Sequence, residues 1–171
     1  MTTLEQFDDI FLLDQKSSSD ERGEFIKFFD HGLIRGKSFV MKQQNFVTSL
    51  QAGTFRGLHF QEGARAEAKI FRTLRGKMQL VFFDTRPASP TFQQSGSVIL
   101  TDPAQAVFIP RGYATGYLTL APDTQVLYMS DEEYAPEAER GISILDPLIQ
   151  LELKIEKPIL SDKDSSWPDW S

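Results

Sequence analysis

Three polar side chains near the middle of the chain have the types that proton abstraction from an anionic substrate requires. Arg56 and His59 lie in the segment Gly53-Thr-Phe-Arg-Gly-Leu-His-Phe-Gln61, and Lys69 follows His59 by ten residues. Histidine titrates closest to neutral pH, so it can accept a proton there. A lysine can stabilise the oxyanion that results, and an arginine can bind a phosphate. The set predicts an acid–base site, although a single histidine in a strand is more often structural.

The elements that must position these side chains are short extended segments. Stretches of alternating apolar and polar residues recur at intervals of about ten residues, separated by glycine, proline and aspartate. Strands are expected at 4–13, 24–29, 37–48, 54–60, 68–74, 77–84, 97–100, 106–109, 116–120 and 125–130. This spacing predicts an all-β fold, and a double-sheet jelly roll is the architecture that fits it best.

The segments between and after these strands are expected to be loops and a short irregular tail. The polar stretches 16–20 and 62–67 predict loops, and Arg75-Gly76 predicts a tight turn. In the tail, from Ile149 to Ser171, we expect short extended pieces and one short helix with Ser161 as its N-cap.

The bulk composition limits the class of protein. A length of 171 residues predicts one domain over residues 1–171, and 40% apolar residues suffice for a large core. The net charge of −6 argues against nucleic acid as a partner, and the absence of cysteine excludes disulfides and thiolate metal sites. The acidic start does not resemble a signal peptide, and no apolar run reaches the roughly 18 residues of a membrane span. We therefore expect a cytoplasmic protein without a membrane partner.

The order of motifs along most of the chain resembles the dTDP-4-dehydrorhamnose 3,5-epimerase family, which are RmlC-like cupins. No single motif is decisive, but their common order from Asp20 to Asp164 is specific. Besides RGLHFQ and the following lysine, the matching motifs are Asp20–Phe25 (DERGEF), Gln43–Asn45 (QQN), Asp84–Arg86 (DTR), Ser89–Phe92 (SPTF), Ile109–Gly116 (IPRGYATG), Tyr128, Tyr134–Pro136 (YAP), Glu139–Gly141 (ERG), Asp146-Pro147 and Leu160–Asp164 (LSDKD).

The resemblance implies a cupin jelly roll that acts on a nucleoside-diphosphate 4-keto-6-deoxyhexose without a cofactor or metal ion. It also implies a homodimer whose subunits exchange their N-terminal strands. The C3 and C5 protons of such a sugar are acidic because they are next to the ketone. Removing one gives an enolate, and reprotonation from the opposite face inverts the centre.

The roles that the resemblance implies fall on named residues. His59 matches the base, Asp164 the carboxylate that orients it, Lys69 the cation at the enolate oxygen, and Tyr128 the tyrosine that returns the proton. We expect His59 and Lys69 to point into the interior. Taken alone, Asp164 would be a solvated tail residue, Lys69 a surface lysine and Tyr128 an ordinary barrel tyrosine. The matches to nucleotide or diphosphate contacts are Arg22, Phe25, Gln43, Asn45, Arg56 and Tyr134, of which Arg22 and Phe25 would come from the partner subunit.

The chain departs from the family pattern at three places. Thr115 stands where the family has a second histidine that contacts the sugar near the ketone, and threonine keeps a hydroxyl but loses charge and length. Lys27 stands where a glutamate helps to read the base, and one residue is inserted between Asn45 and Arg56. Because the base, its carboxylate, the lysine and the tyrosine are all kept, we expect an active epimerase. Whether C3, C5 or both are inverted stays open.

Three other interpretations also stay open. A sugar-nucleotide 3,4-ketoisomerase on the same fold would use a closely spaced histidine pair, which His59 lacks. A non-catalytic sugar-nucleotide-binding cupin would agree with the lost histidine, but the kept Asp164 and Tyr128 oppose it. A metal cupin needs about three histidines and a carboxylate, whereas this chain has only His59 and a distant His31. His31 precedes a glycine and is expected to be a turn residue, so no metal site is expected.

Overall fold

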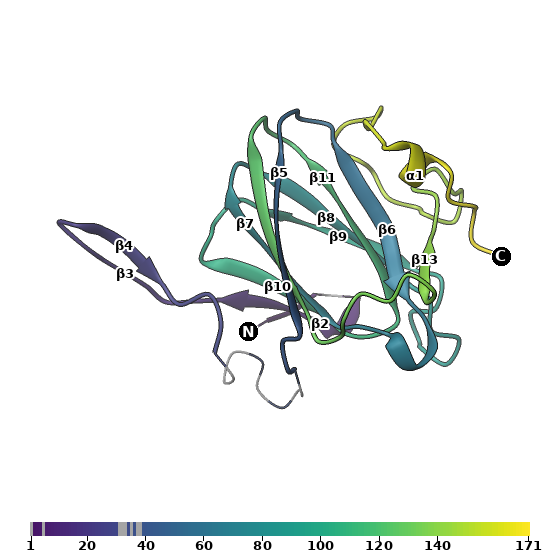
Figure 1. Ribbon diagram of the computed structural model, residues 1–171, viewed down its shortest axis with the longest axis horizontal. Helices are drawn as coiled ribbons and strands as arrows, with labels where there is room; N and C mark the ends of the chain where they lie inside the picture. The colour runs from purple at the N-terminus through teal and green to yellow at the C-terminus, as the bar shows by residue number, and fades with distance from the viewer. Residues whose placement is uncertain (1, 5, 31–33, 35, 37–38) are drawn as a thin grey trace.

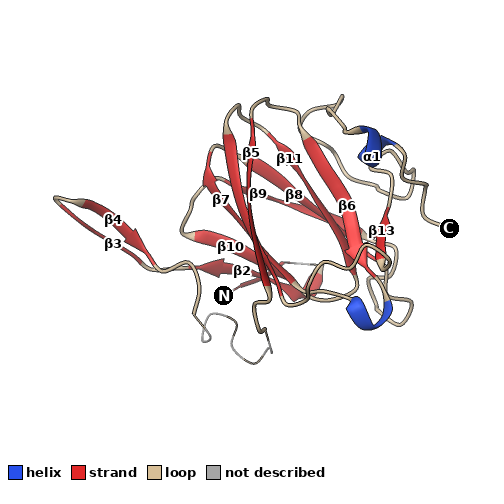
Figure 2. Cartoon of the chain, viewed as in Figure 1, coloured by secondary structure: helices blue, strands red, loops and turns tan. Residues whose placement is uncertain are grey.

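The fold consists of two antiparallel sheets with a hairpin that projects from them (Figures 1 and 2). The computed structural model describes residues 2–4, 6–30, 34, 36 and 39–171. In spatial order the six-stranded sheet contains β1 (Thr2–Leu4), β2 (Phe7–Asp14), β10 (Gln105–Ile109), β7 (Lys69–Arg75), β12 (Thr124–Ser130) and β5 (Gln43–Ser49). The five-stranded sheet contains β13 (Glu139–Gly141), β6 (Phe55–Gln61), β11 (Tyr113–Thr119), β8 (Met78–Asp84) and β9 (Ser95–Leu100). The expected all-β, double-sheet architecture is confirmed.

Three smaller elements complete the chain. The projecting hairpin consists of β3 (Ser17–Asp20) and β4 (Gly23–Ile26), and the single turn of 3₁₀-helix η1 (Gly63–Arg65) lies in the loop after β6. The C-terminal helix α1 (Asp162–Ser165) begins after Ser161, whose hydroxyl accepts a hydrogen bond from the backbone N–H of Asp164. The N-cap expected at Ser161 is therefore confirmed, because a serine oxygen satisfies an N–H group at the start of a helix.

The main core fills the space between the two sheets. In β8 the even-numbered side chains Met78, Leu80 and Phe82 point into this space, where the Phe82 ring meets that of Phe7 edge-on, with ring centroids 5.0 Å apart. The odd-numbered Val81 and Phe83 belong to a second cluster on the outer face of the same sheet. Both faces of β8 are thus buried, which explains why its sequence is a nearly continuous apolar run rather than an alternating one.

The C-terminal tail covers that outer face and brings its last residues to β6. Apolar tail residues, among them Leu151, Ile155 and Trp170, pack on the five-stranded sheet. The backbone carbonyl of Ile159 accepts a hydrogen bond from Phe55, at 2.9 Å, and the Ile159 N–H donates one to Gly53, at 2.7 Å. These bonds fix the chain just before α1, and the tail therefore has a structural reason to lie beside β6.

Several predicted boundaries were wrong. Of residues 16–20, expected to be a loop, Ser17–Asp20 form the strand β3, which pairs with β4 in a register that sets Ser18 opposite Phe25. Three successive serines have little intrinsic strand preference, so only the pairing reveals this strand. The strand expected at 24–29 ends at Ile26, and β11 begins at Tyr113 rather than at 116.

Two further differences concern the segment before β5 and the end of the fold. Of the strand expected at 37–48, residues 37–38 lie outside the described residues, and β5 begins only at Gln43. The prediction for His31 also lies outside the described residues.

Strand β13 was not expected, because three residues are too few for a period-two pattern. Within the described parts of the chain, no helix has the length and apolar composition needed to cross a bilayer.

Candidate active site

A cavity of about 270 Å³ contains the four residues expected to be catalytic. His59, on β6, comes from the five-stranded sheet, whereas Lys69 on β7 and Tyr128 on β12 come from the six-stranded sheet. Asp164 reaches the cavity from α1. His59 and Lys69 therefore face the interior, as expected. The full lining is Val47, Arg56, His59, Lys69, Phe71, Thr115, Gly116, Tyr117, Tyr128, Ser161, Lys163 and Asp164.

A short polar contact in the cavity joins His59 to Asp164. The His59 Nε2 atom lies 2.6 Å from Oδ1 of Asp164, whose side chain is only 6% exposed. Burial acts to raise the pKa of Asp164, but hydrogen bonds from His59, Ser161 and the backbone of Gly57 outweigh it and lower that pKa. Asp164 is therefore ionised and accepts the Nε2 hydrogen, which leaves the Nδ1 lone pair of His59 to take a proton.

Close packing of two strands sets the place of His59. Strands β6 and β11 approach so closely at Gly57 that a Cβ atom there would lie 2.4 Å from the Gly116 Cα. Gly57 also has φ +131°, a conformation that L side chains rarely adopt. This close approach lies beside the register pair that puts His59 opposite Thr115. The glycines of the RGLH and ATG motifs thus allow the base to stand beside Thr115.

Lys69 is held by three neighbours inside the cavity. Its Nζ atom lies 2.8 Å from Oε1 of Glu67, 3.3 Å from the Thr115 hydroxyl and 3.4 Å from the backbone oxygen of His59. The Lys69 side chain is 10% exposed, and a buried cation is costly unless a charge compensates it. The Glu67 carboxylate provides that charge. Sequence reasoning missed Glu67, because only the fold shows that Lys69 is buried and needs an opposite charge.

Tyr128 faces the same space from the other sheet. Its ring stacks on Phe71, with centroids 5.4 Å apart. Burial raises the pKa of the Tyr128 phenol, and the Glu67 carboxylate raises it further, against a smaller opposing effect of Arg56. The phenol is therefore protonated at neutral pH and can act as a proton donor. The cavity thus has a base on one sheet and an acid on the other.

A set of polar residues borders the cavity next to His59. The Glu139 carboxylate accepts hydrogen bonds from the Tyr134 hydroxyl, at 2.7 Å, and from Lys163, at 2.8 and 2.7 Å. Burial acts to raise the pKa of Glu139, but these two partners lower it. Lys163 and Glu139 were not among the predicted site residues. The signal for both was present, because Lys163 precedes Asp164 and Glu139 begins the ERG motif.

The other predicted binding residues fall into two groups. Gln43 accepts the N–H of Tyr134, at 3.0 Å, and donates to Asn45, at 3.2 Å, so the structure brings these three together. Arg56 lines the main cavity, where its Nε lies 3.5 Å from the Ser49 hydroxyl. Gln43 and Tyr134 line a small space next to this cavity, so they and Arg56 can contact a ligand that occupies it.

The structure does not bring Arg22, Phe25 and Lys27 to this cavity. Arg22 and Phe25 lie on the hairpin β3–β4, which projects away from the sheets (Figure 1). Arg22 pairs with Asp20, at 2.5 Å, and Lys27 pairs with Asp30, at 3.7 Å. The Phe25 side chain is 66% exposed. In this chain these three residues therefore lie apart from His59 and the cavity around it.

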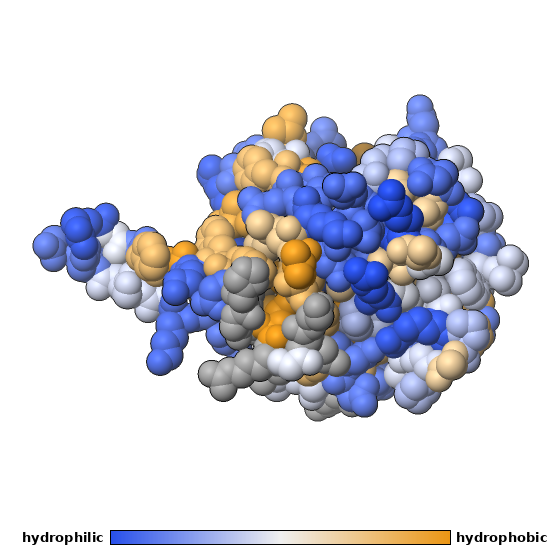
Figure 3. All heavy atoms as spheres, turned by 60° about the horizontal axis from the view of Figure 1, so that its bottom comes forward, coloured by the Kyte–Doolittle hydropathy of each residue, from blue (hydrophilic) through white to orange (hydrophobic). Residues whose placement is uncertain are grey.

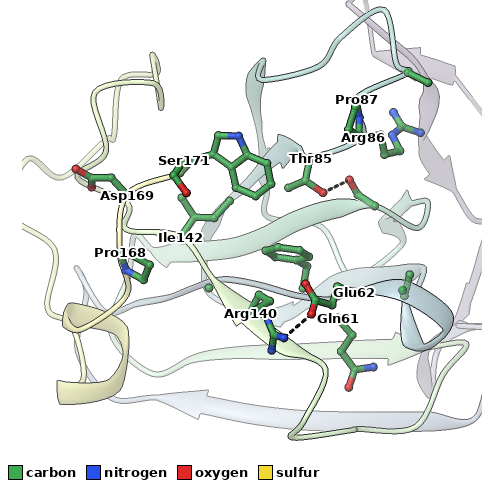
Figure 4. Close-up of a pocket in the computed structure, with 17 residues that line it drawn as sticks. Gln61, Glu62, Thr85, Arg86, Pro87, Arg140, Ile142, Pro168, Asp169 and Ser171 are labelled. Atoms are coloured by element: carbon green, nitrogen blue, oxygen red, sulfur yellow. Dashed lines mark hydrogen bonds and ion pairs between the residues drawn. The ribbon is translucent and has the colours of Figure 1, made fainter.

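A second and larger cavity, of about 570 Å³, lies away from these groups (Figure 4). It is lined by Phe60 and Ile142 and by the C-terminal residues Pro168–Ser171. Its two arginines are already paired, Arg140 with Glu62 (Figure 4) and Arg86 with Asp84. A diphosphate needs a cation that it does not have to share. In the smaller cavity the Arg56 guanidinium contacts the Ser49 hydroxyl and forms no ion pair within the described part of the chain, so this cavity is the better candidate for the active site despite its size.

The fold and this cavity together define a class of enzyme. A cupin-type jelly roll that holds an oriented base, a buried cation and a protonated phenol can remove a proton from carbon on one face and return one on the other. These are the catalytic groups that an acid–base isomerase requires.

Comparisons with known proteins identify the family. A family model described as dTDP-4-dehydrorhamnose 3,5-epimerase matches residues 5–171. The dTDP-4-dehydrorhamnose 3,5-epimerase of Shigella flexneri is 32% identical over 160 residues, which cover 91% of this chain and 88% of that protein. The chain belongs to the dTDP-4-dehydrorhamnose 3,5-epimerase family, and it is an epimerase.

Two solved structures extend the comparison. The dTDP-4-dehydrorhamnose 3,5-epimerase from Bacillus anthracis, solved with TDP and PPi bound, matches with a TM-score of 0.91 at 34% identity, over 95% of this chain and 94% of that one. ChmJ from Streptomyces bikiniensis, a 3'-monoepimerase solved in complex with dTDP-quinovose, matches with a TM-score of 0.89 at 29% identity, over 99% of this chain and 87% of that one. The family thus includes an enzyme described as acting at a single centre.

Proposed function

We propose that the protein epimerises a dTDP-linked 4-keto-6-deoxyhexose, with His59 as the base and Tyr128 as the acid. The observation that carries this proposal is the 2.6 Å contact between His59 and Asp164 in a cavity that also holds Lys69 and Tyr128. The family supplies the substrate class, because its relatives are named for that reaction.

In the proposed reaction each group has one task. The His59 Nδ1 atom takes the proton from the carbon next to the ketone, and Asp164 stabilises the imidazolium that forms. The ammonium of Lys69 stabilises the enolate oxygen. Tyr128 then donates its phenolic proton to the opposite face of the carbon, which inverts the centre.

The diphosphate and the nucleotide need further contacts. Arg56 lines the cavity and is suited to a phosphate, because its guanidinium offers several donors in a fixed plane. Gln43, Asn45 and Tyr134 lie together next to the cavity and offer amide and phenol groups to the nucleotide or the sugar.

The remaining contacts would come from a second subunit. An isolated two-stranded hairpin is marginally stable in water, and the hairpin β3–β4 exposes Phe25. Apolar surface also adjoins the root of this hairpin (Figure 3), and Val40, Met41 and Phe46 are 62%, 41% and 58% exposed. These features support a homodimer in which each hairpin, with Arg22, Phe25 and Lys27, reaches the cavity of its partner.

Thr115 favours an enzyme that inverts one centre much faster than the other. Its hydroxyl contacts Lys69 and the backbone of His59, so it stands next to the expected place of the enolate oxygen. Threonine provides no titrating proton there. That a family relative is described as a monoepimerase supports this narrower activity.

The test is NMR in D₂O with a panel of dTDP-4-keto-6-deoxyhexoses. The proposal expects deuterium uptake at C3 or C5, with one carbon exchanging much faster than the other. Equal and fast uptake at both carbons would refute the proposal that one centre is inverted much faster than the other. Uptake at neither carbon, together with tight binding, would favour a sugar-nucleotide-binding protein instead.

A further inference from the structure

A small polar chamber adjoins the active-site cavity and touches both its base and its acid. The chamber has a volume of about 100 Å³, and its lining includes His59, Lys69 and Tyr128, which also line the main cavity. The rest of its lining includes the carboxylates of Glu67 and Glu139. A space of this size and polarity admits about three water molecules, at roughly 30 Å³ each.

The proposed reaction leaves the enzyme with a proton in the wrong place. Each inversion moves one proton from the sugar to His59 and another from Tyr128 to the sugar. The enzyme therefore ends as an imidazolium and a phenolate, with one proton too many on one sheet and one too few on the other. It can repeat the inversion in the same direction only after a proton has left His59 and a proton has returned to Tyr128.

We propose that the small chamber returns this proton and that Glu67 carries it. The inference rests on the proposed function, because it assigns the return step of that reaction. The His59 N–H bond breaks as water in the chamber accepts the proton, and the water passes a proton to the Glu67 carboxylate. The resulting carboxylic acid then gives its proton to the Tyr128 phenolate. One proton moves in total, and His59, Glu67 and Tyr128 all regain their starting states.

The contacts of the two carboxylates favour Glu67 over Glu139 as the carrier. Both oxygens of Glu139 accept hydrogen bonds from Lys163, and one also accepts the Tyr134 hydroxyl, which lowers the pKa of Glu139. Glu67 forms an ion pair with Lys69 at one oxygen and accepts a hydrogen bond from the Ser130 hydroxyl at the other, at 2.6 Å. Fewer contacts therefore stabilise the charged form of Glu67 than that of Glu139.

Glu67 is also the carboxylate that affects the acid most. After burial, its charge has the largest effect on the pKa of Tyr128, ahead of Arg56 and Glu139. The Glu67 side chain is 12% exposed, so bulk solvent has little access to it. Because Glu67 lines the same chamber as Tyr128, a proton on its carboxylate is held next to the phenolate that must recover one.

The decisive variant is Glu67→Gln, which keeps the size of the side chain but cannot carry a proton. Because the glutamine also removes the charge that compensates Lys69, we expect its single-turnover deuterium uptake, measured with enzyme in excess, to fall. Its kcat should fall at least tenfold more than its single-turnover uptake, since proton-transfer groups contribute about 10²–10⁴-fold. Raising the concentration of a small buffer such as formate or imidazole should restore kcat. The matched control Glu137→Gln changes an exposed glutamate outside the chamber and should keep its kcat.

The possible results separate the alternatives. An equal loss of single-turnover uptake and kcat, without any response to buffer, would mean that Glu67 only positions Lys69. An unchanged kcat would also overturn the proposal. If the glutamine variant does not fold, Glu67→Asp takes its place, and a lowered kcat that buffer does not raise overturns the proposal equally. Failure of the wild-type protein to take up deuterium would instead reject the proposed function.

Discussion

A single residue, His59, links the base of the site to its cation. The imidazole contacts Asp164, while the backbone oxygen of the same residue accepts hydrogen bonds from Lys69 and Thr115. A change in the backbone at this position would therefore disturb the base and the cation together. Substitutions that test the chemistry must keep the size of the side chain and the place of the main chain.

His59→Asn meets that condition and removes the base. We expect deuterium uptake by the substrate to fall at least 10²-fold, since general-base catalysis contributes about that much or more. Asp164→Asn should lower the rate by roughly 10²-fold for the same reason, because His59 loses its orienting charge. NMR in D₂O gives the rates, and dTDP affinity serves as the control for folding. Full exchange by His59→Asn would reject this residue as the base.

Thr115→His tests the origin of the single-centre activity. A charge-assisted hydrogen bond to the ketone is worth about 1.5–3 kcal/mol, or roughly 10- to 150-fold in rate. We expect the histidine variant to raise deuterium exchange at the slow carbon by a factor in that range and to change the fast carbon little. Thr115→Ser is the matched control, because it keeps the hydroxyl without adding a titrating group. A histidine variant with the wild-type ratio of the two rates would contradict the role of Thr115.

At the scale of elements, the alternation of residues predicted the central strands well, because packing on both sheets follows the period of two. β6, β7, β8 and β12 begin and end within a few residues of the expected ranges. The pattern failed where pairing with another segment decides the structure, as it does for Ser17–Asp20 in the hairpin.

Within the site, the sequence alone pointed to His59 and Lys69 by residue type, whereas Asp164 required the family pattern. Asp164 is separated from His59 by 105 residues, and no local pattern reports such a contact. Glu67 was missed for a related reason, because only the fold shows that Lys69 is buried and needs an opposite charge.

The end of β8 depends on one fully buried carboxylate. Asp84 accepts hydrogen bonds from Arg86, Ser89 and Thr91 at 2.5–2.8 Å. Burial acts to raise the pKa of Asp84, but these bonds outweigh it and lower that pKa to about 2. The DTR and SPTF motifs therefore hold a turn of the scaffold.

Asp84→Asn should lower the free energy of unfolding by about 2 kcal/mol at pH 7, because charged hydrogen bonds to a buried group are lost. An aspartate titrates near 3.9 when unfolded, and the folded value is lower. The stabilisation by Asp84 is therefore complete above about pH 4 and is lost as the pH falls towards 2. Urea unfolding of both proteins at a series of pH values should show their difference shrinking across that window. A constant difference would exclude the titration of Asp84 as its cause, and the exposed Glu156→Gln serves as the control.

At the scale of the whole molecule, the projecting hairpin makes the proposed dimer testable. Phe25→Ser removes an exposed apolar side chain that contributes little to the isolated subunit. If the hairpin packs on a partner, the variant should weaken the dimer by about tenfold, as loss of an aromatic interface contact commonly does. The KM for the dTDP-sugar should rise with it. Analytical ultracentrifugation and steady-state kinetics give the two values.

Ile99→Ser is the control for this experiment, since Ile99 is also an exposed apolar residue but lies on β9, far along the chain from the hairpin. It should leave both the dimer and the KM unchanged. A wild-type protein that sediments as a monomer with full activity would exclude the exchange of hairpins.

The position of Asp164 in the tail has a consequence for damaged or incomplete chains. All the other expected catalytic groups precede residue 130, so a chain that stops short of α1 would still have its sheets, its cation and its acid. It would lack the charge that orients His59. In the tail before α1, trypsin has an exposed target at Lys154. Turnover should decline in step with release of the peptide that contains Asp164, as followed by mass spectrometry, so catalysis itself reports whether a molecule still carries this segment.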